Sequence, residues 1–172
     1  AAFHGSLFRS EWRPLTLPED VPAPSWAVVG RDPLGLAGVP SYGSLEELTG
    51  DVPPYVLVTL PTAQDAALAE QVHDALQETL RLVRSWLAED RFAGSRLVLV
   101  TRGAVAGEPG ERISGLAQSP VWGLVRSAQA ENPDCFVLVD ADEAPASLAA
   151  LPAALATGEP EIVLHGGEAR VR

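Results

Sequence analysis

Residues 96–101 read Arg96-Leu97-Val98-Leu99-Val100-Thr101, a short run that is apolar at every position except its two ends. Runs of this length and composition are typical of strands that are buried on both faces of a parallel sheet. Four other segments have the same character, namely residues 25–29, 55–59, 136–140 and 161–165. The sequence therefore predicts buried parallel strands at the centre of the fold.

Helical patterns separate these strands. Residues 62–89 contain neither Pro nor Gly and carry apolar side chains at spacings of three and four, as expected for an amphipathic helix that lies against a sheet. These side chains belong to Leu68, Val72, Leu76, Leu80, Val83 and Leu87. Further helices are predicted over 116–130 and 147–156, and a short one over 44–48, where Ser44 and Glu47 fit a capping box.

Strands that alternate with helices are connected by right-handed crossovers. We therefore expect an α/β, Rossmann-like fold with a mainly parallel sheet and helices on both of its faces. Gly166 and Gly167 offer a two-residue hairpin turn into a last strand over 168–172.

The N-terminal segment differs from the rest. Residues 6–13 alternate, so that Phe8 and Trp12 share one face of a strand. Four prolines over 14–24 then form an extended connector, which can continue neither a helix nor an inner strand. We expect a docking strand sent away from the main body, a Pro-rich connector, and a Rossmann-like body over 25–172, all within a single domain over residues 1–172.

Composition excludes several kinds of chemistry. The chain has 23 acidic and 12 basic residues, all of the latter Arg, and a net charge of −11. Without Lys it has neither the Lys of a phosphate-binding P-loop nor one for a Schiff base. Its acidity predicts no nucleic-acid or membrane partner, because both need clustered cations. A single cysteine, Cys135, and an N-terminus without the pattern of a signal peptide predict a cytoplasmic protein.

No cofactor-binding or catalytic residue is predicted. The turn after the first buried strand, Gly30 to Gly38, has the wrong glycine spacing for a dinucleotide fingerprint, and Pro33 removes one backbone N–H. Neither Tyr42 nor Tyr55 is followed four residues later by Lys, as in short-chain reductases.

Metal binding is not predicted either. The histidines His4, His73 and His165 are scattered, and there is one thiol in the chain, so we interpret them as solvated or capping residues. Three carboxylates, those of Asp140, Asp142 and Glu143, follow a strand where α/β proteins place catalytic groups. Without a phosphate-binding loop nearby, a solvated turn is the favoured interpretation.

The segment 121–133 allows two interpretations. Trp122, Arg126 and Glu131 could face a ligand from a helix. The favoured alternative is that Trp122 packs on the sheet, Gly123 permits close approach, and Arg126 and Glu131 fix the helix in place, because buried aromatic residues usually supply contact area.

The same segment carries a resemblance. Val-Trp-Gly-Leu-Val-Arg-Ser-Ala-Gln-Ala-Glu-Asn-Pro over 121–133, followed by Cys-Phe-Val-Leu-Val-Asp over 135–140, resembles the ketoreductase region of bacterial modular polyketide synthases, in its N-terminal structural subdomain. Other pieces agree in order across nearly the whole chain, namely 7–14, 86–88, 91–104, 149–160 and 166–167. Cys135 departs from the family pattern, where Arg is usual.

The resemblance implies a truncated, degenerate short-chain dehydrogenase/reductase fold that binds no cofactor. It would support a catalytic subdomain that carries NADP(H) and reduces the β-ketoacyl group on an acyl carrier protein, with an enoylreductase as a further neighbour in some modules. We expect the segment 6–13 and the helix 116–130 to supply the docking surface, through Phe8, Trp12, Trp122 and Arg126.

Two other functions remain open. The chain could be a self-contained Rossmann-like module that binds a small molecule at the strand ends near Gly30, Pro61 and Arg102-Gly103. It could also be an interaction domain between large subunits.

Overall fold

The computed structural model describes residues 11–22, 25–30, 36, 38–60 and 66–172. Phe8 and most of the expected docking strand lie outside the described residues, as does much of the turn after Gly30.

Among the described residues, eight strands form one sheet in the order β1-β8-β7-β6-β5-β4-β2-β3. The five expected parallel strands are its centre: β2 (Trp26–Val29), β4 (Tyr55–Thr59), β5 (Arg96–Thr101), β6 (Phe136–Ala141) and β7 (Glu161–His165). Gly166 and Gly167, with φ of 60° and 85°, turn the chain into the antiparallel β8 (Glu168–Val171). The expected α/β, mainly parallel fold is confirmed.

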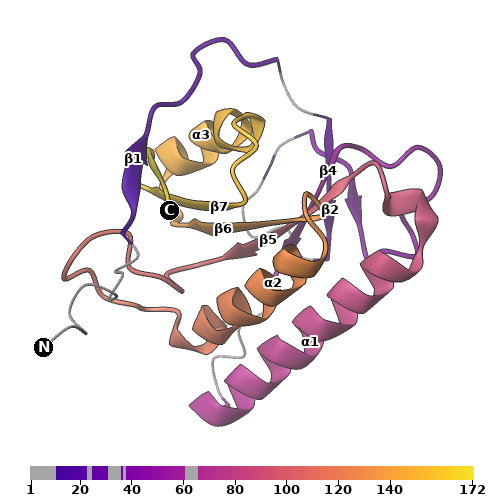
Figure 1. The fold of residues 1–172 in the computed structure, drawn as a ribbon, viewed down its shortest axis with the longest axis horizontal. Coiled ribbons are helices and arrows are strands. Elements are labelled where there is room, and N and C mark those ends of the chain that lie inside the picture. The colour runs from indigo at the N-terminus through magenta and orange to yellow at the C-terminus, as the bar shows by residue number, and fades with distance from the viewer. Residues whose placement is uncertain (1–10, 23–24, 31–35, 37, 61–65) are drawn as a thin grey trace, which may run out of the picture.

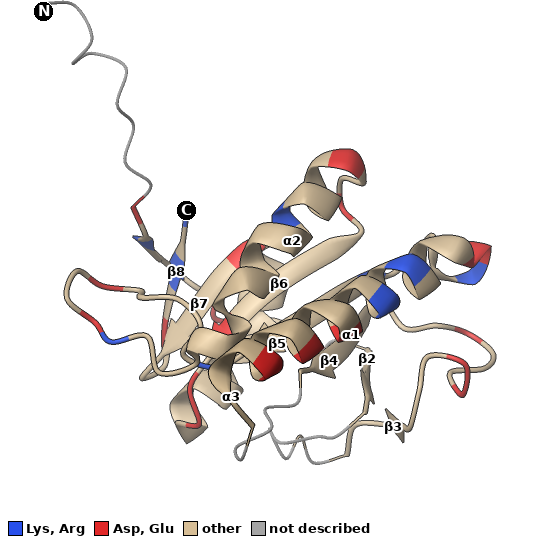
Figure 2. Cartoon of the chain, turned by 90° about the horizontal axis from the view of Figure 1, so that it is seen from below, with Lys and Arg blue, Asp and Glu red and all other residues tan. Residues whose placement is uncertain are grey.

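Helices cover both faces of the sheet. Figures 1 and 2 show α1 (Leu68–Ala88) and α2 (Ser119–Glu131) side by side on one face and α3 (Pro145–Ala156) on the other. Short 3₁₀ turns follow α1, as η2 (Asp90–Phe92), and precede α2, as η3 (Leu116–Gln118). Side chains of β5 alternate between two cores: Leu97 and Leu99 face the layer of α1 and α2, and Val98 and Val100 face that of α3.

The apolar stripe of α1 is turned only in part toward the sheet. The side chains that α1 buries are those of Ala75, Thr79, Leu82, Val83 and Trp86. Leu68 and Leu87, both in the expected stripe, are 48% and 45% exposed. The expected orientation is therefore right only in part: Val83 of the expected stripe is buried, but the other buried positions of α1 are not in that stripe, among them Trp86, whose ring stacks on Phe92 at 4.3 Å between centroids.

The N-terminal strand belongs to this chain's own sheet. Strand β1 (Arg13–Leu15) pairs antiparallel with β8, Arg13 opposite Val171 and Leu15 opposite Ala169. Pro14 is tolerated because β1 lies at the edge of the sheet, where a missing N–H breaks no inner pairing. Arg13 and Pro14 therefore belong to an edge strand of the body, which corrects the start of the connector at residue 14, whereas residues 6–10 of the expected docking strand lie outside the described residues.

The expected helix over 44–48 is absent, and this segment forms a turn. It follows a two-residue strand that was not expected, β3 (Ser41–Tyr42). The guanidinium of Arg91 donates to the carbonyl oxygens of Leu45 and Leu48, and Glu47 accepts from Gly43 N–H at 2.7 Å rather than from the residue after it. A helix of only five residues is also unstable by itself, because its few hydrogen bonds do not offset the cost of helix nucleation.

Candidate functional site

The parallel strands end together at one edge of the sheet. Strand β2 lies between β3 and β4 in the sheet. The chain passes from β2 to β3 on one side and then crosses to β4 on the other side, so the strand order reverses at β2. Doubly wound α/β proteins bind ligands at such a reversal of strand order, outside the carboxyl ends of the strands. A cavity of about 840 Å³ lies there, lined by Gly30, Thr59, Leu60 and residues of α1 and η3.

The polar side chains in the wall of this cavity are engaged. Gln118 donates to the Leu60 carbonyl oxygen at 2.8 Å and accepts from the Arg102 N–H at 2.9 Å. Arg81 is paired with Glu78 at 2.7 Å. Across the described part of the chain, no buried side-chain nitrogen or oxygen lacks a hydrogen-bond partner. The charged side chains of Glu78, Arg81 and Arg102 line the cavity together with apolar ones, so its wall is of mixed character.

Asp140 lies beside this edge, at the end of β6, and is fully buried. Its Oδ1 accepts hydrogen bonds from the Thr101 hydroxyl at 2.6 Å and from the Ala104 N–H at 2.9 Å. The interpretation of a solvated turn is thus wrong for Asp140. It holds for Asp142, whose carboxylate accepts from the backbone N–H groups of Ala144 and Gly166.

His165, at the end of β7, bridges two carboxylates. Its Nε2 lies 3.1 Å from Asp140 Oδ2, and its Nδ1 lies 2.8 Å from Glu111 Oε1. The hydrogen bond to Asp140 is the main cause that raises the pKa of His165 above its usual 6.5; burial opposes this rise, and Glu111 adds to it. The protonated ring donates to both carboxylates, so the expectation of a solvated or capping histidine is corrected.

A continuous hydrogen-bonded network links α2 to the loop 102–115. Trp122 Nε1 donates to Thr101 Oγ1 at 2.9 Å, and Thr101 in turn donates to Asp140. At the other end Glu111 accepts from Gly107 N–H at 2.6 Å. Within the described ranges no group of three His, Cys, Asp or Glu residues is arranged to hold a metal ion. The network is fully satisfied, which suits it to fixing the loop on the sheet.

We expect the stability of the chain to fall as pH rises through the pKa of His165. A folded-state pKa above the unfolded value of 6.5 means that protonated His165 contributes stability that is fully present below pH 6.5 and is lost at higher pH. His165→Gln should remove this part of the pH dependence. Urea unfolding at a series of pH values measures it.

His73→Gln is the matched control, because His73 is exposed on α1. A His165→Gln curve that runs parallel to the wild-type curve at all pH values would contradict the assignment.

The proposed docking residues are reassigned in part. Trp122 is 1% exposed and packs in the core of its own chain, so it has no surface to offer a partner. Trp12 meets it edge-on at 5.8 Å between ring centroids. Arg126 makes two 2.7 Å hydrogen bonds to Glu161 and lies over the Trp122 ring. These residues hold β1, α2 and β7 together, as the favoured interpretation predicted for Trp122 and Arg126.

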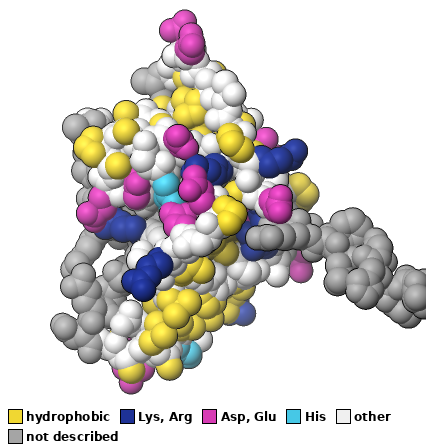
Figure 3. All heavy atoms as spheres, turned by 90° about the vertical axis from the view of Figure 1, so that its left-hand side faces the viewer, with side chains coloured by type: hydrophobic (Ala, Val, Ile, Leu, Met, Phe, Trp, Pro, Cys, Tyr) yellow, Lys and Arg dark blue, Asp and Glu magenta, His cyan; other side chains and the backbone are white. Residues whose placement is uncertain are grey.

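Large hydrophobic side chains are exposed elsewhere. Among the described residues, the exposed large hydrophobic side chains are those of Leu68 and Leu87 on α1, Leu116 in η3 and Ile113 in the loop before η3. Figure 3 shows hydrophobic side chains gathered in the lower half of one view of the molecule, below a group of charged ones. We define the outer helix face as the surface over α1 and α2 to which the following residues contribute: Leu76, Leu80, Leu87, Leu116, Pro120, Gly123 and Ser127.

Sequence reasoning did not find this face, because it assigned the whole stripe of α1 to the sheet. An available indication was that 62–89 has more large aliphatic residues than one buried side of a helix needs. In the part of the chain that is described, no helix is both long and apolar enough to cross a bilayer.

Comparison with known proteins gives a consistent picture. Residues 10–172 match the family described as the Rossmann fold domain of the polyketide synthase extender module SpnB. The polyketide synthase GfsE of Streptomyces halstedii is 45% identical over 168 residues, which is 94% of this chain but 4% of that protein. The mycoketide-CoA synthase of Mycobacterium tuberculosis is 42% identical over 147 residues, or 86% of this chain and 3% of the relative.

Solved structures agree on the fold. A C2-type ketoreductase from a modular polyketide synthase superposes with a TM-score of 0.66 at 21% identity, over 94% of this chain and 41% of the other. The ketoreductase from the first module of phoslactomycin biosynthesis in Streptomyces sp. HK803 superposes with a TM-score of 0.60 at 25% identity, over 94% and 35%. The chain thus spans less than half of these structures and a small part of the curated relatives.

Proposed function

Because the chain belongs to the family of Rossmann fold domains of polyketide synthase extender modules, we propose that it is the structural subdomain of a ketoreductase. In this role it supports a catalytic subdomain of the same polypeptide, which binds NADPH and reduces a β-ketoacyl group on an acyl carrier protein. An enoylreductase is a further neighbour in fully reducing modules. The half-buried single thiol of Cys135 fits a cytoplasmic setting.

The outer helix face carries the proposal. Leu87 and Leu116 are 45% and 50% exposed, although each would gain free energy from burial. Large apolar side chains that stay exposed on one layer of a domain often mark an interface. The face extends over the layer of α1 and α2 from Leu116, which also lines the cavity, to Leu87 in the last turn of α1.

The chemistry of the strand edge supports a role without catalysis. The sequence contains no Lys, whereas short-chain reductases place a Lys four residues after the catalytic Tyr. At the strand ends Asp140, Thr101 and His165 are hydrogen-bonded to one another or to the backbone and serve the fold. This chain therefore depends on its partner for both hydride and proton transfer.

We expect Leu87→Glu combined with Leu116→Glu to loosen the two subdomains. In this chain alone the exposed positions should change the free energy of unfolding by about 0.5 kcal/mol or less. In a polypeptide with both subdomains the change should remove about 3 kcal/mol or more of docking energy, because two buried leucines and their desolvated surroundings are lost. Urea unfolding of each polypeptide measures the change in the free energy of unfolding. The rate of NADPH-dependent reduction by the polypeptide with both subdomains is a second readout.

Ala149→Glu, on the exposed side of α3, is the control and should leave both properties unchanged. Equal stability and activity of the double variant and this control would rule out docking through the outer helix face.

The cavity favours a second candidate, a self-contained binding module. Its volume of about 840 Å³ at the reversal of strand order is in the range of small-molecule sites. Titration of the chain with NADPH distinguishes the binding module from the structural subdomain. Saturable binding in the micromolar range would favour the binding module.

A further inference from the structure

The loop between β5 and η3 closes on itself at its base. Residues 102–115 form neither helix nor strand, and the Gly115 N–H donates to the Gly103 carbonyl oxygen at 2.8 Å. A Cβ on Gly115 would lie 2.0 Å from the Arg102 carbonyl oxygen, and Gly103 has a φ of 61°. Both positions therefore need glycine. An Ω-loop of this kind has its two ends held together, so its body can open without disturbing the base.

The body of this loop covers part of β7. We define the flap as residues 105–114, which follow Ala104, whose N–H is held by Asp140. Gly107 of the flap is buried, and a Cβ there would lie 2.9 Å from Val163 Cγ1. Val163 is fully buried, while both of its neighbours in β7 face the core under α3. The flap thus covers Val163 on the opposite face of the sheet, and opening of the flap exposes this side chain to water.

Polar contacts hold the outer part of the flap. Residues 108–114 are exposed, so burial of apolar surface contributes little to keeping them in place. Ion pairs tie this part to the sheet: Arg170 of β8 donates to Glu108, and His165 of β7 meets Glu111 at 2.8 Å. The carboxylate of Glu111 also accepts from two backbone N–H groups of the flap, at 2.6 and 3.1 Å. Glu111 therefore both shapes the flap and fixes it to β7.

The tie between His165 and Glu111 depends on protonation. A neutral imidazole has one N–H donor and one lone pair, so it donates to only one of the two carboxylates that His165 bridges. Asp140 is fully buried and has no water to replace this donor, whereas Glu111 is exposed and can bind water. Neutral His165 therefore keeps its proton on Nε2, toward Asp140. Its Nδ1 lone pair then faces the carboxylate of Glu111.

The other charged groups around His165 act in the same direction. They are Asp140 and Asp142 from β6 and the turn after it, Glu108 and Glu111 from the flap, and Glu168 and Arg170 from β8; α3 carries no charged residue. The charge of Arg170 is already shared between two of these carboxylates. When His165 is neutral, the carboxylates of the sheet and of the flap repel one another without a cation between them. This repulsion favours the open flap.

We infer that the flap is a pH-dependent switch, which the contact between protonated His165 and Glu111 closes on β7 and which opens above its base when His165 is neutral. This inference does not depend on docking through the outer helix face. Opening uncovers Val163 and displaces Ser114, which lines the cavity at the strand edge, so the switch also changes the wall of that cavity. The hydrogen bond to Asp140 raises the pKa of His165 above 6.5, so the flap opens above this pH.

Trypsin, which cleaves after Arg, tests the switch at the bond between Arg112 and Ile113 of the flap. The initial rate in the chain is divided by the rate in an unstructured peptide of the same local sequence, at about pH 6 and about pH 9. Proteolysis of a folded protein reports the population of its open form. We therefore expect the divided rate to be at least about threefold higher at the higher pH. An equal divided rate at both pH values would overturn the inference.

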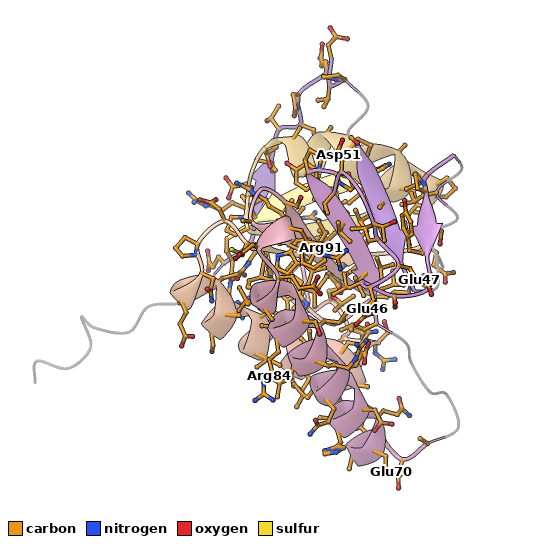
Figure 4. All side chains as sticks on the ribbon, turned by 90° about the vertical axis from the view of Figure 1, so that its right-hand side faces the viewer. Glu46, Glu47, Asp51, Glu70, Arg84 and Arg91 are labelled. Atoms are coloured by element: carbon orange, nitrogen blue, oxygen red, sulfur yellow. The ribbon has the colours of Figure 1, made fainter. Side chains whose placement is uncertain are left out.

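Arg84 is the internal control for unfolding of the whole chain. Figure 4 shows its side chain projecting from α1, and Trp86 two residues later is buried. Cleavage after Arg84 requires this part of α1 to unfold, so it should stay at least about tenfold slower than cleavage in the flap at both pH values. Comparable rates at the two sites would mean that the whole chain opens, which would also overturn the inference.

Two variants separate the tie that senses pH from the one that does not. Glu111→Gln removes the charge that faces His165, so the divided rates at the two pH values should become equal. Glu108→Gln is the matched control: it weakens the tie to Arg170, so cleavage should be faster by the same factor at both pH values and the wild-type ratio should remain. A wild-type ratio in Glu111→Gln would contradict the switch.

Discussion

Asp140→Ala is expected to lower the free energy of unfolding of the chain by about 3–5 kcal/mol. Asp140 is fully buried and accepts from the Thr101 hydroxyl, the Ala104 N–H and the His165 ring. Its removal leaves these donors without their acceptor and places His165 next to a cavity. An uncompensated buried donor costs more than a normal hydrogen bond contributes. Urea unfolding at neutral pH measures the loss.

Glu143→Ala is the matched control, because Glu143 follows the same strand but its side chain is 73% exposed in an ion pair with Arg102. A change of about 1 kcal/mol or less is expected there. Asp140→Asn should fall between the two, and it should lower the pKa of His165, because the main cause of the raised pKa is removed. If Asp140→Ala costs no more than Glu143→Ala, the network does not hold the loop 102–115.

The parallel strands could be predicted from sequence because burial on both faces leaves a local pattern. Each run such as 96–101 is apolar at consecutive positions, and no partner has to be known to identify it. The hairpin at Gly166-Gly167 is equally local, since its two positive φ angles need a residue without Cβ.

Other features depend on contacts between distant segments. The rotation of α1 follows from which residues meet α2 and the sheet, and periodicity alone cannot separate a stripe that faces the sheet from one that faces a partner. The burial of Asp140 depends on Thr101 and His165, which are 39 and 25 residues away in sequence. The turn at 44–48 depends on Arg91, which is 43 residues from Leu48.

The burial of Trp122 could not be predicted for a related reason. Tryptophan is enriched at interfaces, but it is equally common in cores, and Trp122 belongs to the core. Exposure, which only the structure gives, distinguishes a core tryptophan from one at an interface.

The largest functional effect is expected when residues 1–172 are removed from the polypeptide that contains them. In the proposed function this chain supplies no reacting group and acts by stabilising its partner through the outer helix face. Without it the catalytic subdomain loses its docking surface, so its folded population and its reduction rate should fall together. Addition of the separate chain should restore both in a saturable way.

The most direct test is the rate of NADPH-dependent ketone reduction by the catalytic subdomain, measured alone and with increasing amounts of this chain. We predict at least about a tenfold lower rate without the chain, which corresponds to about 1.4 kcal/mol, recovery on its addition, and no reduction by the chain by itself. Full activity of the catalytic subdomain alone, or reduction by this chain alone, would contradict the account.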